Sequence, residues 1–460
     1  MSNGSGNGTK ARRSVQRLAV IQPDVAGIDL AAEEHWVCGP AREDGNPNVE
    51  RFGTRTHELE ALAEWLLAQG VKSVAMESTG VYWIPLYELL ESRGIEAVLV
   101  NARQLSHVPG RKTDMQDCQW LQLLHSCGLL RGSFRPKDAI CRLRALHRQY
   151  ANLVAERSRA IQWMQKALDQ MNVQVHRAVS DLSGKTGLAI VRAIVAGERD
   201  PMRLAQHRDF HCRKSVAEIA AYLRGNWREE HLFNLKMALA LYDRIAEMLR
   251  DYEAEIARQM EALQPPDRRE APVPPHPNRT KERVIRSRGE QDQRANLWRF
   301  AGVDMTRIDG LSPDACRLIL TEVGPDLSAF PSEKHFVSWL RLSPRTAISG
   351  GKVLPRRRNA TGATRIAGVL RMAAMSVGKG KTALGASYRR IARRKGADVA
   401  VFATARKLAV LIYRMLRFGQ DYIDEGMQAY EARFEAKRLH NLHSVAKQLG
   451  YQLVPLETAA

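Results

Sequence analysis

A short apolar run near the amino terminus, residues 25–30, is interrupted by a single acid, Asp29. A carboxylate among apolar and glycine residues in such a run indicates a central β-strand, which is buried on both faces. An acid there costs several kcal/mol unless a partner compensates it, and its near neighbours in the sequence include no lysine or arginine. The fold must therefore bring other groups, or a bound cation, to Asp29.

Three further acids lie where one fold can bring them to Asp29. Glu77 ends a second apolar run, and Asp114 and Asp117 open a helical stretch that Thr113 is placed to cap. Each has an ordinary interpretation as well, Glu77 as a turn residue and the aspartates as first-turn acids that favour the helix dipole. Four acids at one site repel by roughly 3 kcal/mol per pair at about 5 Å, so we expect a divalent cation there.

The segments between these acids predict a sheet flanked by helices. Periodicity and capping residues predict strands at 25–30, 35–38, 49–52, 71–76 and 96–100, and helices at 56–69, 83–92 and 114–130. The resulting order is β-β-β-α-β-α-β-α, with acids on the first strand, after the fourth strand and on the last helix. This order resembles the ribonuclease-H-like fold, to which RuvC-like nucleases belong, over residues 21–131.

Charge separates this part of the chain from the rest. The formal net charge of +20 and the pI near 9.9 indicate a polyanionic partner, with nucleic acid as the leading candidate. Residues 21–130 hold 16 acidic and 8 basic residues, a net charge of −8. Because the whole chain has a net charge of +20, the residues outside this range carry a net charge of +28. We therefore expect an acidic catalytic part and a basic remainder that binds phosphates.

Several classes of protein are disfavoured by the sequence. The six cysteines form no Cys-x-x-Cys pair and have no histidines at zinc-ligand spacing, so we predict reduced thiols. No run reaches the ~18 apolar residues of a membrane span, and the start of the chain lacks the apolar core of a signal peptide. We expect a soluble, cytoplasmic protein.

The fold class we predict is α/β followed by mostly α. Apolar steps of three and four in the middle of the chain predict a helical hairpin or coiled coil, which serves as a spacer or as a dimerising arm. The expected segments are a disordered basic tail at 1–20, a catalytic domain at 21–131, a helical or coiled-coil region at 137–263, a proline-rich extended linker at 264–297, a mostly helical domain at 298–426 and a helical tail at 427–460.

The domain at 298–426 carries a second candidate for chemistry. Ser349 precedes two glycines in a cation-rich stretch, where a serine can attack a phosphodiester; the plainer alternative is a phosphate-binding loop. Ser338 and Ser343 are rival nucleophiles, although neither precedes a glycine. The cations predicted to bind nucleic acid are Lys352, Arg356, Arg357, Arg358, Arg365, Arg371, Arg389, Arg390, Arg393 and Arg394.

Several of these runs resemble a known family, the IS110 family of insertion-sequence transposases, which is related to the Piv invertase. The runs at 26–29, 77–83, 101–103 and 112–117 resemble its amino-terminal motifs, and those at 310–324 and 343–352 resemble its C-terminal transposase domain. The resemblance implies a RuvC-like site in which Asp29, Glu77, Asp114 and Asp117 hold Mg²⁺, with two ions expected. It also implies that Ser349 forms a covalent serine–DNA intermediate.

The same resemblance implies further partners. A structured bridge RNA, encoded at the ends of the element, would pair with donor and target DNA, so that base pairing supplies the sequence choice. The protein would assemble as a dimer or tetramer with composite sites, in the bacterial cytoplasm and at the nucleoid when bound to DNA. No membrane is implied.

The function predicted from the sequence is therefore a transposase or site-specific DNA recombinase with a serine nucleophile and a magnesium-binding acidic site. Two alternatives stay open at this point. One is a hydrolytic RuvC-like nuclease of the junction-resolvase type, in which the acids activate water. The other is a nucleic-acid-binding protein without catalytic activity.

Overall fold

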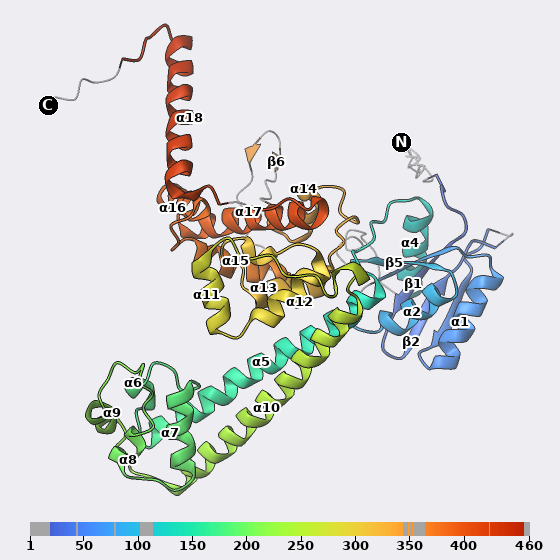
Figure 1. Ribbon diagram of the computed structural model, residues 1–460. Coiled ribbons are helices and arrows are strands. Elements are labelled where there is room, and N and C mark those ends of the chain that lie inside the picture. The colour runs from blue at the N-terminus through green and yellow to red at the C-terminus, as the bar shows by residue number, and fades with distance from the viewer. Residues whose placement is uncertain are drawn as a thin grey trace, which may run out of the picture. The chain divides into compact units, whose positions relative to one another are not determined.

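The computed structural model (Figure 1) describes residues 19–42, 45–77, 80–101, 114–343, 348–349, 352–353, 364–422 and 424–454. At Asp114 and in the segments 348–349 and 352–353 the description covers the backbone alone. The chain divides into two compact units, Met1–Arg135 and Pro136–Ala460. Within the described ranges, no helix combines the length and apolarity needed to cross a membrane.

The first unit is built on a five-stranded sheet. Its strands are β1 (Val25–Leu30), β2 (Glu34–Cys38), β3 (Val49–Gly53), β4 (Ser73–Glu77) and β5 (Glu96–Val100). The order across the sheet is β3-β2-β1-β4-β5, in which β1–β2 and β2–β3 are antiparallel and β1–β4 and β4–β5 are parallel. All five predicted strands are confirmed, and β1 lies at the centre, which explains its nearly continuous apolar sequence.

Helices cover both faces of this sheet (Figure 1). They are α1 (Thr56–Ala68), α2 (Trp83–Ser92) and α4 (Asp114–Ser126). Helices α1 and α2 share a core with Ile28 and Met76 on one face. On the other face, Leu121 of α4 packs with Ala75 of β4. The strand order and the three layers agree with the predicted ribonuclease-H-like fold.

The second unit begins with two long helices that run side by side in opposite directions (Figure 1). Helix α5 spans Asp138–Gln170 and helix α10 spans Glu229–Ala262. Leu153 of α5 packs with Ile245 and Leu249 of α10. The predicted helical hairpin is therefore confirmed, whereas the supercoil that defines a coiled coil stays a prediction.

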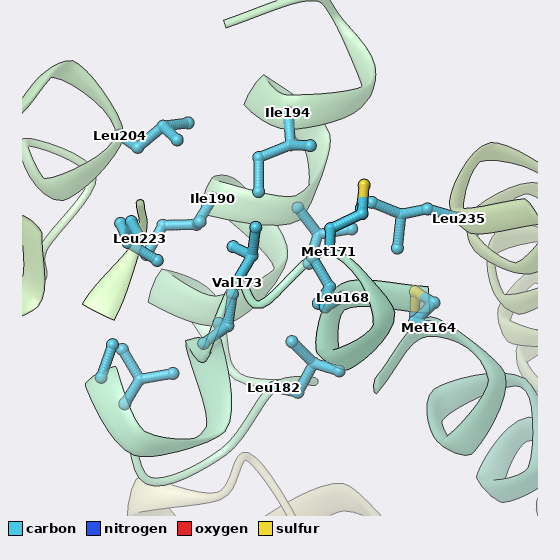
Figure 2. Packing of buried hydrophobic residues seen from close by; sticks show 14 of the residues in the cluster. Met164, Leu168, Met171, Val173, Leu182, Ile190, Ile194, Leu204, Leu223 and Leu235 are labelled. Carbon is cyan, nitrogen blue, oxygen red and sulfur yellow. The ribbon is translucent and has the colours of Figure 1, made fainter. Parts of the chain in front are cut away.

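Four short helices join α5 to α10, and we call residues 171–228 the tip. They are α6 (Val175–Ala178), α7 (Lys185–Val195), α8 (Pro201–Ala205) and α9 (Val216–Tyr222). Figure 2 shows that side chains from α5, the tip and α10 form one packed cluster, which includes Leu168, Ile190 and Leu235. The tip therefore shares a hydrophobic core with the adjoining ends of α5 and α10, and this core supports its loops.

The rest of the second unit is mostly helical. Its helices are α11 (Arg279–Ser287), α12 (Gln291–Ala301), α13 (Pro313–Val323), α14 (Glu333–Trp339), α15 (Arg365–Val377), α16 (Ala383–Lys395), α17 (Ala397–Phe418) and α18 (Gly426–Gln448). Helix α17 packs with α14, α15 and α16. Two short strands, β6 (Ile348–Ser349) and β7 (Lys352–Val353), form an antiparallel pair.

The proline-rich stretch at 264–297 is not extended throughout. Helices α11 and α12 occupy its second half, and the buried side chains of Ile285 and Leu297 anchor them. Arg294 donates to Asp304 Oδ2 at 3.0 Å and 2.6 Å and forms a buried ion pair with it. The two residues are 10 positions apart in the sequence, so local sequence patterns do not reveal the pair. Residues 279–287 and 291–297 are therefore helical, which corrects the extended linker predicted there.

Candidate active site at the sheet edge

Asp29 and Glu77 lie at the carboxyl ends of two neighbouring parallel strands, Asp29 as the penultimate residue of β1 and Glu77 as the last residue of β4. The register of β1 and β4 pairs Gly27 with Ala75 and Ile28 with Met76, so Asp29 and Glu77 are the next residues on each strand. Both are half-buried. This register places the two acids at the same height, at the carboxyl ends of both strands. Neighbouring strands lie about 4.8 Å apart, so the two acids are close together.

Both acids face helix α4. A Cβ atom on Gly27 would lie 2.4 Å from the backbone oxygen of Cys118 and 2.3 Å from the backbone nitrogen of Gln122, so the α4 backbone rests directly on β1 at Gly27. Side chains alternate along a strand, so Asp29, two residues beyond Gly27, points to the α4 side. Glu77 does so too, because Ala75, two residues before it, packs with α4.

The direction of α4 brings its first turn to this edge. His125, in its last turn, is 2.9 Å from the Oγ of Ser73, the first residue of β4, and Ser126 accepts the backbone N–H of Ile21 at 2.8 Å. The end of α4 thus lies at the start of the parallel strands. Its beginning, with Asp114 and Asp117, lies towards the strand ends that carry the other acids.

Cys118 lies in α4 where this helix packs on β1 at Gly27. Burial above all, with the nearby Cys38 and Asp29, raises the pKa of the Cys118 thiol to about 12. Its Sγ atom lies 3.1 Å from the backbone oxygen of Met115. The thiol is therefore neutral and inert. All six cysteines are unpaired thiols, as predicted.

The donor set at this edge is chemically suited to a hard divalent cation, which prefers carboxylate oxygens. Asp117 is half-buried, in the first turn of α4, where the positive end of the helix dipole favours negative groups. Among the residues whose side chains are described, no three histidine, cysteine or acidic groups come together around one point. The side chain of Asp114 and the capping residue Thr113 lie outside that description.

Ser349 is the last residue of β6 and its backbone pairs with Lys352 of β7. The rival serines lie outside this hairpin: Ser338 is exposed in α14, and Ser343 is half-buried. The flanking cations Arg356, Arg357 and Arg358 lie outside the described residues.

Four of the predicted cations extend from helices at least partly into solvent. Arg365 lies in the first turn of α15, 4.0 Å from the buried Glu322. Arg371, in the same helix, is half-buried with its guanidinium 5.5 Å from the ring centre of Phe402. Arg393 and Arg394 are exposed in the last turn of α16.

Arg389 and Arg390 have contacts within the protein. Arg389 donates to the carbonyl oxygens of Gly378 and Gly380 at 3.1 Å and 2.7 Å, and so closes the turn before α16. The guanidinium of Arg390 lies 3.7 Å from the ring centre of Phe434 in α18. These contacts give both arginines a structural role that their position in a basic run does not predict.

Two polar sites were missed by the sequence prediction. Glu322 is buried and accepts from Arg148 at 2.9 Å and 2.8 Å, which ties α13 to α5. Lys407 donates to the buried Ser387 at 2.6 Å, and burial lowers the pKa of Lys407. The partners are 174 and 20 residues apart, so no local pattern in the sequence could have revealed them.

Comparison with known families decides the identity of the chain. A transposase family model of the DEDD type matches residues 26–173, and a model described as transposase IS116/IS110/IS902 family matches residues 304–389. The chain belongs to the IS110 family of transposases. Together the two matches cover about half of this IS110-family chain. No curated protein matches it.

The matched ranges contain the candidate residues of this IS110-family chain. The first match spans β1, β4 and α4, with Asp29, Glu77, Asp114 and Asp117, and the second spans the hairpin with Ser349. The ribonuclease-H-like fold of the first unit agrees with a DEDD-type domain. The family acts on DNA as its substrate, which agrees with the basic charge of the second unit.

Proposed function

We propose that this IS110-family transposase cuts and rejoins DNA strands with Ser349 as the nucleophile, assisted by Mg²⁺ at Asp29, Glu77, Asp114 and Asp117. One observation carries the acidic half of the proposal. The β1–β4 register and the close packing of α4 at Gly27 turn two strand-end acids towards the helix that carries the other two. This arrangement supports a site to which three separate segments contribute carboxylates.

The DEDD type of the domain supports dependence on a divalent metal. Two bound Mg²⁺ ions would lower the pKa of a hydroxyl group and stabilise negative charge on the oxygen that leaves. Asp29 and Glu77 would hold such ions from the sheet, and Asp114 and Asp117 from the helix. The half-exposed position of Asp29, Glu77 and Asp117 leaves room for a phosphodiester to approach.

The serine step is a transesterification. The Ser349 oxygen forms a bond to phosphorus, the bond from phosphorus to the 3′ oxygen breaks, and the serine proton is lost while the 3′ oxygen gains one. The product is a serine phosphodiester and a 3′-hydroxyl. A 3′-hydroxyl of another strand then attacks this phosphodiester and releases the serine, so no cofactor is consumed on rejoining.

We further propose that a structured bridge RNA guides the reaction and that the protein acts as a dimer or tetramer. The net charge of +28 outside residues 21–130 supports a large polyanionic partner. Base pairing between the RNA and the donor and target DNA would supply sequence choice, while the protein binds backbones.

The test is to trap the covalent intermediate. The full chain is incubated with Mg²⁺, the RNA transcribed from the ends of its element and labelled DNA, then denatured and separated by electrophoresis. We expect a protein–DNA adduct with the wild type and none with Ser349→Ala, while DNA binding is retained. Ser338→Ala and Ser343→Ala serve as matched controls and should form adducts normally.

Each other outcome contradicts a defined part of the proposal. Cut DNA without any adduct identifies a hydrolytic nuclease, in which the acids activate water. Adducts that persist in Ser349→Ala but vanish in Ser338→Ala or Ser343→Ala move the nucleophile to that serine. Unchanged adduct formation after Asp29→Ala and Glu77→Ala would show that these acids take no part in the reaction. Nucleic-acid binding by the wild type without any cutting or adduct, and unchanged in these two variants, would support a binding protein without catalytic activity.

A further inference from the structure

The loop between α8 and α9, residues 206–215, holds aromatic rings in solvent at the tip. Phe210 is 78% exposed as a whole residue, and the side chain of His211 is 78% exposed. Their ring centres are 3.7 Å apart with an angle of 36° between the ring planes. An aromatic pair that points outward in this way offers an open ring face to a flat partner.

Asp209 fixes the start of this ring pair. Its Oδ1 accepts the backbone N–H of His211 at 3.0 Å and lies 2.8 Å from the Nδ1 of the same residue. Its Oδ2 pairs with Lys185 Nζ at 2.9 Å, and its own backbone N–H donates to the buried Thr186 at 3.0 Å. The backbone donor of His211, with Lys185, holds the pKa of Asp209 well below its usual range, so the carboxylate stays charged.

Arg208 fixes the other side of the loop. Its guanidinium donates to the carbonyl oxygens of Cys212 and Lys214 at 2.6 Å and 2.7 Å. Leu204, in the helix that precedes the loop, lies in the packed cluster of the tip (Figure 2). The loop is therefore held rigidly while Phe210 stays outside the core, and a rigid aromatic group loses little entropy when it binds.

The surroundings of the ring pair are basic. Residues 171–228 hold 10 basic and 5 acidic residues. Arg213, in the same loop, is exposed, whereas Arg203 of α8 is 75% exposed in its side chain and pairs with Glu198 and Asp200 at 3.6 Å and 3.9 Å. Exposed aromatic rings among cations are the combination by which proteins bind unpaired nucleotides, because bases stack on the rings and phosphates pair with the cations.

We propose that the tip loop is a binding site for an unpaired nucleobase, which stacks on Phe210 while the exposed Arg213 attracts the adjoining phosphate. This inference rests on the proposed function in one respect, that nucleic acid is the partner, and not on the acidic site or Ser349. The loop lies between the two matched ranges, 26–173 and 304–389, so the family comparison assigns it no role. An unpaired base in RNA and one in single-stranded DNA share the chemistry required.

The test measures binding of the full chain to three probes of one sequence: single-stranded RNA, single-stranded DNA and blunt duplex DNA. EDTA is present, so strand cleavage does not contribute. We expect Phe210→Ala to weaken single-strand binding about 10-fold and to leave duplex binding unchanged. Phe210→Trp should retain binding. Phe233→Ala removes a phenylalanine that is 61% exposed on the straight helix α10, and it serves as the matched control with no expected effect.

The pattern of results separates this inference from the proposed reaction. A larger loss with RNA or with DNA identifies the source of the base, and a photo-crosslink from a 5-iodouracil probe to Phe210 would support the stacking directly. Equal binding of Phe210→Ala and wild type, or an equal loss on duplex DNA, would overturn the inference. Either result leaves the adduct experiment untouched, and failure of adduct formation leaves this binding comparison untouched.

Discussion

Glu322 and Asp29 both lie on ordered elements among apolar neighbours, but they differ in burial and in the charges that surround them. Glu322, on α13 of the second unit, is 6% exposed, and Arg148, Arg144 and Arg365 lie at 2.8 Å, 3.4 Å and 4.0 Å from it. Asp29, on β1 of the first unit, is half-buried at a strand end and faces a helix that carries more acids. Burial alone therefore does not mark a functional carboxylate; the charges gathered around it distinguish a structural acid from a candidate ligand.

The largest effect that this comparison predicts is on strand cleavage. Asp29→Asn and Glu77→Gln should each lower the rate of Mg²⁺-dependent cleavage by roughly 10²–10³-fold, because a neutral amide binds a cation poorly. The melting temperature should change little. Glu64→Gln, an exposed acid on α1 at the opposite face of the sheet, is the control and should cleave normally. Normal cleavage by Asp29→Asn would contradict the role of Asp29 as a metal ligand and so remove its contrast with Glu322.

Gly27→Ala tests the packing that turns Asp29 towards α4. Its new Cβ would lie 2.3 Å and 2.4 Å from backbone atoms of α4, which cannot move aside as a flexible side chain does. We expect the first unit to lose at least about 3 kcal/mol of stability in urea unfolding. The control is Gly368→Ala in helix α15, where a Cβ meets no atom within 4 Å and alanine favours the helix. Equal stability of the two variants would contradict the close packing.

Glu322→Gln tests whether Glu322 stabilises the second unit. The substitution removes the charge that balances Arg148 and Arg144, so we expect a loss of about 3 kcal/mol in the unfolding free energy of the second unit. Glu333→Gln breaks the more exposed ion pair with Arg414, 2.6 Å apart, and should cost about 0.5 kcal/mol. A small effect of Glu322→Gln would show that this acid is not the structural centre described above.

A further effect, on the pH dependence of stability, is expected from His147, whose surroundings include Glu322. Burial, with the nearby cation of Arg317, lowers the pKa of His147 from 6.5 to about 4. Above pH 6.5 the histidine is neutral in both states and stability is full. Between 6.5 and 4 the unfolded chain binds the proton first, so stability falls by about 3 kcal/mol. His147→Gln should flatten this part of the stability curve relative to wild type, whereas the exposed His440→Gln should not.

The sequence alone predicts much of the first unit. Alternation and capping signals are local, so the five strands and the helix at Asp114 could be located, and the fold order then brought Asp29 and Glu77 to one edge. The role of Gly27 could not be predicted, because it depends on where α4 crosses β1. A glycine in an apolar strand, followed two residues later by an acid, was the available signal.

The second unit was predicted less well, and for a physical reason. Its charged helices α11 and α12 bury few apolar residues and are fixed by pairs such as Arg294 with Asp304, whose formation depends on the tertiary fold. The arginine set around Glu322 joins α5, α13 and α15, which are far apart in the sequence. Local patterns could identify a basic helical region but not which arginines neutralise a buried acid.

The measurement that tests the central claim most directly is metal-directed cleavage of the protein backbone. Fe²⁺ substituted for Mg²⁺, with ascorbate and peroxide, cuts polypeptide next to the bound ion. We predict cuts near residues 29, 77 and 114–117 together, suppressed by excess Mg²⁺ and lost in Asp29→Asn. Cuts confined to one of these segments, or a pattern that Asp29→Asn leaves unchanged, would contradict a shared metal site at the sheet edge.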